Sequence, residues 1–150
     1  MKTVIQRVTR GRVIVDGRTV GEIGRGAVLL VGVEHGDTQA DADATAEKIA
    51  KMRFFPGETP MDRTLADVEG GCLVVSQFTL AANHRKGNRP SFSRAMDPAL
   101  AEELYLRVVA QLDDLGIPTA TGEFGAMMHV ELVNDGPVTF ILHAVDGRIQ

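Results

Sequence analysis

A chain of 150 residues, 44% apolar and 24% charged, is long enough for one globular domain with a buried core. Its formal net charge of −4 argues against general, sequence-blind coating of nucleic acid, but it leaves room for a local basic patch. The single cysteine, Cys72, excludes an internal disulfide and opens an apolar run, so a buried, inert thiol is favoured over a nucleophile. The N-terminus lacks the apolar region of a signal peptide, and no apolar stretch approaches the ~18 residues that span a bilayer. We therefore expect a cytoplasmic protein without membrane contact.

The first third of the chain predicts strands. The segments RVIV and RTVGEI flank Asp16-Gly17, which is the strongest short signal for a β-hairpin. The run AVLLVGV, Ala27 to Val33, is continuously apolar and of strand length, so we expect a strand buried on both faces.

A first helix is predicted after this strand. Asp37 or Thr38 is placed to cap it, and it should run to about Phe54, where two prolines and a glycine in FFPGETP break it. Gly70-Gly71 then precedes a further apolar strand that begins at Cys72.

A second helix has clearer signals. Asp97 is the expected N-cap, Pro98 suits the first turn, and Gly116 is placed to end the helix in a left-handed conformation. Apolar residues recur along the face that we expect to be buried: Leu100, Leu104, Val108, Leu112 and Leu115.

The last third returns to strand patterns in PTATGEF, MMHVELV and VTFILHAV. Asn134-Asp135-Gly136 is expected to form a turn between the last two of these strands. Residues 146–150 are either a short tail or an extra cover for a sheet edge. The order strands, helix, strand, helix, strands predicts a single α/β domain over residues 1–150 with a mixed sheet and two main helices.

The strand LVVSQFTLAA carries polar residues where valine would serve stability better. Ser76, Gln77 and Thr79 are either satisfied by neighbours in a core or face something that is not protein. A serine-hydrolase interpretation would use Ser76 or Thr79 as the nucleophile, but no G-x-S-x-G elbow surrounds either residue. The bases available to it are distant in sequence: His84, His129 and His143.

The histidines and acids give little support for a metal site. The four histidines are far apart, and no second cysteine accompanies Cys72. The acidic residues cluster on expected helix faces, where a solvated surface is the simpler interpretation.

A basic segment, NHRKGNRPSFSR, follows the polar strand directly. Charge runs are usually solvated loops, but a basic, glycine-hinged loop beside a strand with free hydrogen-bonding groups is typical of a phosphate clamp. The cations are Arg85, Lys86, Arg89 and Arg94.

The segment LVNDGPVTF places Pro137 at the start of an expected strand, where it removes a ladder donor. A Gly-Pro pair at a tight turn is a candidate cis peptide. The simpler interpretation is a plain turn; the functional one is a rigid backbone feature whose carbonyls face a ligand.

Together, VVSQFTL at 74–80 and NDGPVTF at 134–140 resemble the two signatures of D-aminoacyl-tRNA deacylases. The likeness includes IQRVTR near the start and GNRPSF in the middle, and it covers nearly the whole chain. The resemblance implies α/β/β layers and an enzyme that hydrolyses the ester between tRNA and a D-amino acid, or glycine mischarged on tRNA(Ala). It also implies rejection of L-aminoacyl-tRNA, with no cofactor or metal.

The resemblance also implies a homodimer with one active site at each side of the interface. Gly136 and cis-Pro137 of one subunit would enter the other subunit's site, and Arg7 would hold the pair. The expected catalytic residues are Ser76, Gln77, Phe78 and Thr79. The N–H groups of Phe78 and Thr79 would bind the oxyanion, and the tRNA's own ribose hydroxyl would help to activate water.

The basic residues Arg85, Lys86 and Arg89 then become expected contacts to the acceptor stem of tRNA, with no role for DNA. One departure from the family pattern is Asp62 in TPMDR, a charge where relatives carry an amide. Two other functions stay open on the residues alone. One is a module that binds tRNA ends without chemistry, and the other is a general esterase that uses Ser76 or Thr79.

Overall fold

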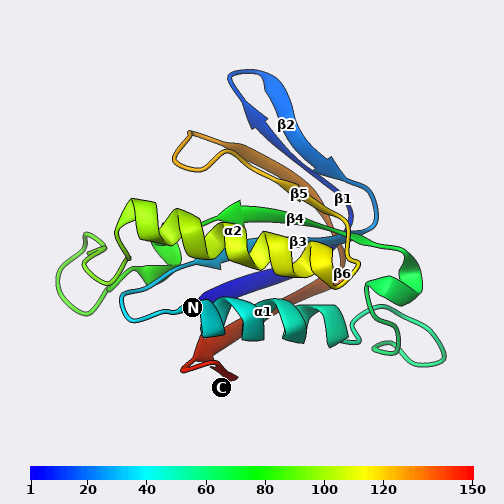
Figure 1. Cartoon of the computed structure of the whole chain (residues 1–150). Helices are drawn as coiled ribbons and strands as arrows, with labels where there is room; N and C mark the ends of the chain where they lie inside the picture. Colours follow the sequence, from blue (N-terminus) through cyan, green and yellow to red (C-terminus); the bar gives the residue numbers. More distant parts are fainter.

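One long strand, β1 (Lys2–Val15), organises the computed structural model, which describes residues 1–150. The first half of β1 pairs with β3 (Gly26–Gly32), and the second half pairs with β2 (Arg18–Ile23). On its other side, β6 (His129–Val145) runs antiparallel along almost the whole of β1 (Figure 1). The hairpin between β1 and β2 turns at Asp16-Gly17, both with positive φ, as predicted.

Two further strands extend the sheet beyond β3. Both β4 (Gly71–Ser76) and β5 (Thr119–Thr121) are parallel to β3, so the sheet is mixed, with the order β5-β4-β3-β1-β6-β7. The prediction of a mixed α/β domain is confirmed. The expected strand PTATGEF is shorter than predicted, since only Thr119–Thr121 pairs with a neighbour.

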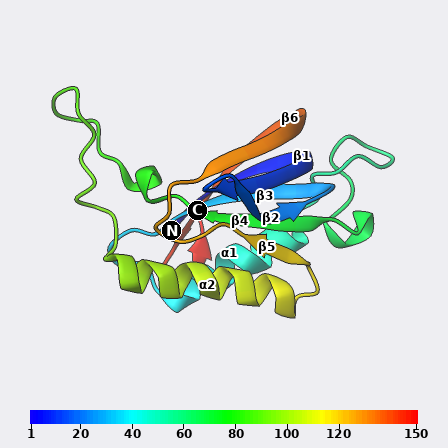
Figure 2. The same ribbon diagram turned by 90° about the horizontal axis from the view of Figure 1, so that it is seen from above.

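The two helices cover one face of the sheet (Figures 1 and 2). Alternate residues of β3, such as Leu29 and Val31, pack with α1 (Gln39–Lys51) and α2 (Pro98–Asp114) in the main core. The residue between Ala27 and Leu29, Val28, points to the opposite face and joins a second core: Val8, Val13, Val15, Val28, Leu73 and Val75.

The second core exists because the sheet curls over itself. Strand β2 approaches β5 so closely that a Cβ added to Gly21 would lie 2.2 Å from the carbonyl oxygen of Thr121. Only glycine allows this contact between two backbones. The curled part of the sheet forms the outer β layer, which gives the expected α/β/β arrangement.

The predicted helix caps are present, although two details of the helices differ. Thr38 caps α1, and its backbone N–H donates to the Asp41 carboxylate at 2.8 Å. Asp97 caps α2 by accepting from the Ala99 N–H at 3.0 Å. The first helix ends at Lys51 rather than near Phe54, which instead enters the main core as a buried side chain.

The buried face of α2 is rotated from the one predicted. Leu100 and Leu115 are 54% and 43% exposed, so their assignment to the buried face was wrong. Leu100 lies one i+4 step before Leu104, which places it about 40° outside the buried face. Leu115 is the C-cap residue, beyond the last residue of the helix. The residues that pack inward are Ala101, Leu104, Tyr105, Val108 and Leu112.

The C-terminal part also differs from expectation. Residues 134–136 do not turn between two strands, because β6 continues through them as one strand interrupted by a bulge. Both halves pair with the same long β1, which holds them in line. Residues 146–150 are an edge cover rather than a tail, since β7 (Arg148–Ile149) pairs back onto β6. No helix has the length and apolar character needed to cross a membrane.

Candidate functional site

The polar segment after β4 presents two backbone donors. Strand β4 ends at Ser76, and the N–H of Gln77 donates to Val31 at 2.7 Å, which holds the chain against β3. A short 3-10 helix, η2 (Phe78–Ala81), follows immediately. The N–H groups of Phe78 and Thr79 start this helix, so they have no acceptor within it. They are available to a ligand oxygen.

The side chains of this segment bond to each other rather than to a histidine. Gln77 Nε2 donates to Thr79 Oγ1, and no histidine hydrogen-bonds to Ser76 or Thr79. This arrangement does not supply the base that a hydroxyl nucleophile needs. Cys72 is no alternative nucleophile, because burial, and then the charge of Asp113, raises the pKa of its thiol to about 12.

The second motif lies in the bulge of β6. Asn134 pairs with Val8 of β1 and Thr139 pairs with Gln6, so the residues between them project from the ladder. The Asn134 side chain spans the bulge, accepting from Val138 N–H and donating to the Thr139 hydroxyl, both at 2.9 Å. At its tip the Gly136–Pro137 bond is cis, and both residues are exposed.

Arg7 is buried beneath this bulge. Its Nε donates to the carbonyl oxygen of Asp135 at 2.9 Å, and Nη1 donates to the carbonyl oxygen of Phe54 at 2.7 Å. A Cβ added to Gly136 would approach Arg7 Nη2 to 3.1 Å, and Gly136 has φ +137°. Glycine is therefore favoured at this position both by backbone conformation and by space.

One chain does not bring the two motifs together. Ser76 pairs with Val31 of β3, and Val31 pairs in turn with Thr3 of β1. The bulge of β6, in contrast, lies opposite Arg7 of β1. The motifs are four residues apart along the strands and three strands apart across the sheet. At about 3.3 Å per residue and about 4.8 Å per strand, the separation is roughly 20 Å.

The basic segment forms an arm beside η2. Asn83 and Ser91 pair through two backbone hydrogen bonds of 2.8 and 3.0 Å and close the base of the arm. The arm extends away from the body of the domain (Figure 2), and its tip carries the exposed cations Arg85, Lys86 and Arg89. The fourth cation, Arg94, is bound back to the buried carboxylate of Glu34 at 3.3 Å.

Comparison with known proteins shows the family to which the chain belongs. Residues 4–143 match the family described as D-Tyr-tRNA(Tyr) deacylase. The chain belongs to this deacylase family. It is 57% identical to a D-aminoacyl-tRNA deacylase of Geobacter sulfurreducens, over 95% of this chain and 94% of that protein. It is 53% identical to one of Heliobacterium modesticaldum, over 99% and 97%. The family expected from the sequence is thereby confirmed, and with it the class of aminoacyl-tRNA ester hydrolases.

Solved structures share the deacylase fold. A protein named c-Myc DNA Unwinding Element Binding Protein superposes with a TM-score of 0.90 at 39% identity, over 97% of this chain and 99% of that one. A probable eukaryotic D-amino acid tRNA deacylase gives a TM-score of 0.80 at 16% identity, over 93% and 97%, which shows the fold alone. The DNA binding in the name of the c-Myc DNA Unwinding Element Binding Protein is a statement about that protein only.

The Asp62 carboxylate in TPMDR accepts from the Glu58 N–H at 2.9 Å, so it stabilises its own loop. Phe92 was not singled out as a site residue, yet its ring packs edge-on against Phe78 with centroids 5.0 Å apart. The GNRPSF segment was visible in the sequence, but its packing against η2 was not.

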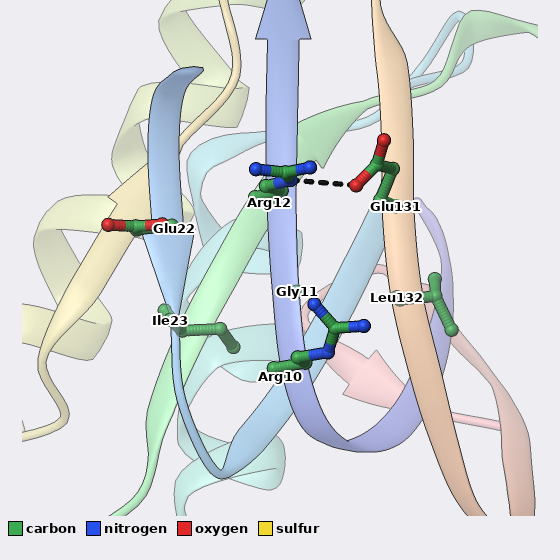
Figure 3. A pocket seen from close by; sticks show the side chains of 7 residues that line it. All are labelled: Arg10, Gly11, Arg12, Glu22, Ile23, Glu131 and Leu132. Atoms are coloured by element: carbon green, nitrogen blue, oxygen red, sulfur yellow. Dashed lines mark hydrogen bonds and ion pairs between the residues drawn. The ribbon is translucent and has the colours of Figure 1, made fainter.

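A pocket of about 150 Å³ lies on the outer β layer, and none of its lining residues belongs to either motif (Figure 3). Arg12 crosses it to bond Glu131 at 2.7 Å, and Arg10 and Glu22 balance each other's charge. Its lining therefore favours neither an anion nor a cation. The two motifs at the end of β4 and in the bulge of β6 remain the candidate site.

Proposed function

We propose that this chain hydrolyses the ester that joins a D-amino acid to the terminal adenosine of tRNA, and that it spares the L ester. The observation that carries the proposal is the end of β4, where two free N–H groups adjoin polar side chains in a chain of the deacylase family. The products are free D-amino acid and tRNA.

The chemistry needs few groups from the protein, because an aminoacyl ester is already activated. A water oxygen adds to the carbonyl carbon, and the N–H groups of Phe78 and Thr79 bind the oxyanion that forms. The C–O bond to the ribose then breaks, and the ribose oxygen takes up a proton. Ser76 and Gln77 orient the substrate, and the neighbouring ribose hydroxyl helps to activate the water.

The working unit in this proposal is a homodimer with a site at each side of the interface. The separation of the two motifs in one chain supports it, because Gly136 and Pro137 can face the strand end only from a second copy. An apolar row also crosses three strands on the face opposite the helices, since Val4 pairs with both Leu30 and Ile141. Ile141 is 79% exposed, and a second copy would bury it.

Selection between the two enantiomers follows from geometry. If the site fixes the ester and the amino group, only two directions at the α-carbon remain for the side chain and the hydrogen. The backbone carbonyls of Gly136 and Pro137 from the second copy would occupy the direction of an L side chain and exclude it. Glycine has no side chain to exclude, so glycyl-tRNA mischarged on tRNA(Ala) would also be hydrolysed.

The arm supplies the contact to the rest of the tRNA. Its three exposed cations, Arg85, Lys86 and Arg89, would bind phosphates of the acceptor stem. Phosphate contacts carry no sequence information, which suits an enzyme that acts on many tRNAs.

The test compares D-tyrosyl-tRNA and L-tyrosyl-tRNA with purified protein in the presence of a chelator. We expect rapid deacylation of the D ester alone, since no step requires a metal or another cofactor. A module that only binds tRNA ends would bind both and hydrolyse neither. A general esterase using Ser76 or Thr79 would hydrolyse both, and would also act on small esters without tRNA.

A further inference from the structure

Two aromatic rings are exposed together at the end of β4. Phe78 is 57% exposed and Phe92 is 36% exposed, and their rings meet edge-to-face at 65°. Such a pair is stabilising, but it keeps apolar surface in water that a core position would bury. In the single chain, this aromatic surface beside the proposed reactive position is available to a ligand with a flat face.

The position of the pair relates it to two parts of the proposed site. Phe78 is the residue whose N–H faces the oxyanion, so its ring lies next to the reacting ester. Phe92 directly follows Ser91, the residue that closes the base of the basic arm. The rings therefore lie between the place of chemistry and the cations at the tip of the arm.

The charge around the rings fits a nucleic acid strand. The sequence from Asn83 to Met96 contains no acidic residue. Arg94 is held by Glu34, which leaves the three cations of the tip for an outside partner. Single-stranded nucleic acid is bound in this way, by cations that contact the phosphates and by aromatic side chains on which the bases stack.

We propose that the Phe78–Phe92 pair is a stacking surface for the nucleobase that precedes the terminal adenosine of tRNA. This inference rests on the proposed function and extends it from the ester to the single-stranded end that carries it. The stacked base fixes the direction in which the strand leaves the site, and it leads the next phosphates toward the arm. Phe92 is thus a binding residue that does not touch the ester.

The experiment uses three D-tyrosyl esters of increasing length: 3′-D-tyrosyl-adenosine, the same ester on the dinucleotide CpA, and D-tyrosyl-tRNA. The dinucleotide adds the one base in question, and the full tRNA adds the acceptor stem. The full chain is compared with Phe92→Leu, which removes the ring but keeps an apolar side chain, and with Phe92→Tyr, which keeps a ring. Leu106→Ala is a matched control, because Leu106 is 49% exposed on α2 and lies outside the site.

We expect kcat/KM to rise from adenosine to CpA in the unsubstituted protein, in Phe92→Tyr and in Leu106→Ala. In Phe92→Leu that rise should be lost, with kcat/KM for CpA and tRNA lower by roughly five- to a hundredfold, the range of one stacked base. An equal loss on all three esters would overturn the inference, because Phe92 would then support the geometry of the ester site. A weaker homodimer in sedimentation velocity would also overturn it, because the rings would then belong to a protein contact.

A binding measurement separates this inference from the proposed function. Uncharged CCA trinucleotide is titrated into the protein and into Phe92→Leu, without any chemistry. Suppose that Phe92→Leu binds the trinucleotide more weakly and that the unsubstituted protein hydrolyses no ester. This result would contradict the proposed function but support the stacking surface. Equal binding of the trinucleotide by both proteins, together with normal deacylation, would contradict the stacking surface alone.

Discussion

The buried guanidinium of Arg7 donates to the carbonyl oxygen of Asp135 at 2.9 Å and thereby fixes the residue that precedes Gly136 to the middle of β1. The same guanidinium reaches Phe54 in the loop after α1. One side chain therefore links the sheet, the loop and the bulge that carries the Gly-Pro pair. The Asp135 carboxylate, 3.5 Å from Nε, faces the charge of Arg7. Removal of the guanidinium would leave the buried carbonyl of Phe54 and the partly buried carbonyl of Asp135 without this donor.

Replacing this residue should loosen the bulge. In Arg7→Gln, we expect the free energy of unfolding to fall by about 3 kcal/mol, because hydrogen bonds to a charged group are lost. The ratio of D- to L-tyrosyl-tRNA hydrolysis should fall as well. Urea titration and paired deacylation assays measure the two effects. Arg12→Gln is the control, because its exposed ion pair with Glu131 should contribute little; equal losses in both variants would refute the role given to Arg7.

The Gly-Pro pair should control the rejection of L esters. We expect Gly136→Ala and Pro137→Ala to gain hydrolysis of L-tyrosyl-tRNA while they keep the D activity, because the carbonyls that exclude the L side chain are displaced. Gly17→Ala is the matched control, since Gly17 also has positive φ, +75°, but lies in a hairpin far from the site. Unchanged rejection of the L ester in folded, active variants would defeat this assignment.

The Thr79 hydroxyl should be dispensable for chemistry. Its oxygen accepts from Gln77, and no base is bonded to it. We expect Thr79→Ala to retain activity within about tenfold of the unsubstituted protein, whereas loss of a true hydroxyl nucleophile removes catalysis by several orders of magnitude. Single-turnover deacylation of D-tyrosyl-tRNA provides the rate. Complete loss with intact fold and tRNA binding would favour the esterase.

Two buried threonines should respond in opposite ways to the same change. The hydroxyl of Thr3 is buried without a hydrogen-bond partner, so Thr3→Val should stabilise the protein by about 1 kcal/mol. Thr45 Oγ1 donates to the Asp41 carbonyl at 2.7 Å, so Thr45→Val should destabilise it. Thermal or urea unfolding of Thr3→Val and Thr45→Val tests this prediction. A loss of stability in Thr3→Val would show that the Thr3 hydroxyl has a hydrogen-bond partner.

Stability should fall in acid below about pH 4, partly through Asp41. Burial alone would raise the pKa of this carboxyl, but hydrogen bonds from the Gly147 N–H, the Thr38 N–H and the Thr38 hydroxyl outweigh it and lower the pKa below its ordinary 3.8. A carboxyl with a lowered pKa in the folded state contributes stability above its unfolded value, and this is lost as the pH falls through the folded value. Unfolding measured from pH 6 downward should therefore lose stability below about pH 4, and less steeply in Asp41→Asn. Identical slopes of stability against pH in the unsubstituted protein and in Asp41→Asn would show that Asp41 does not contribute.

Local chemistry made much of the fold predictable. The turn at Asp16-Gly17 and the caps at Thr38 and Asp97 depend on neighbouring residues only, and each is present. The buried face of α2 depends on which side meets the sheet, and its last residue depends on how the chain leaves it, so sequence spacing misplaced Leu100 and Leu115.

The candidate site could likewise be predicted only in part. Its two motifs were visible in the sequence, because polar residues and a Gly-Pro pair interrupt strands. Their separation in one chain follows from the register of β1 with β3 and β6, which residue patterns do not specify. The contact between Phe78 and Phe92 likewise depends on how the arm packs.

The curl of the sheet also determines where this protein is open to unwanted strand addition. With β2 against β5, the long outer edge is that of β6, and β7 covers it only at Ala144 and Val145. Exposed edges of this length promote aggregation unless something interrupts them. Here Pro137 lacks the N–H that a docking strand would use, and the bulge breaks the spacing. Pro137→Ala returns that donor to the edge, so preparations of this variant should be checked for self-association before their activity is compared.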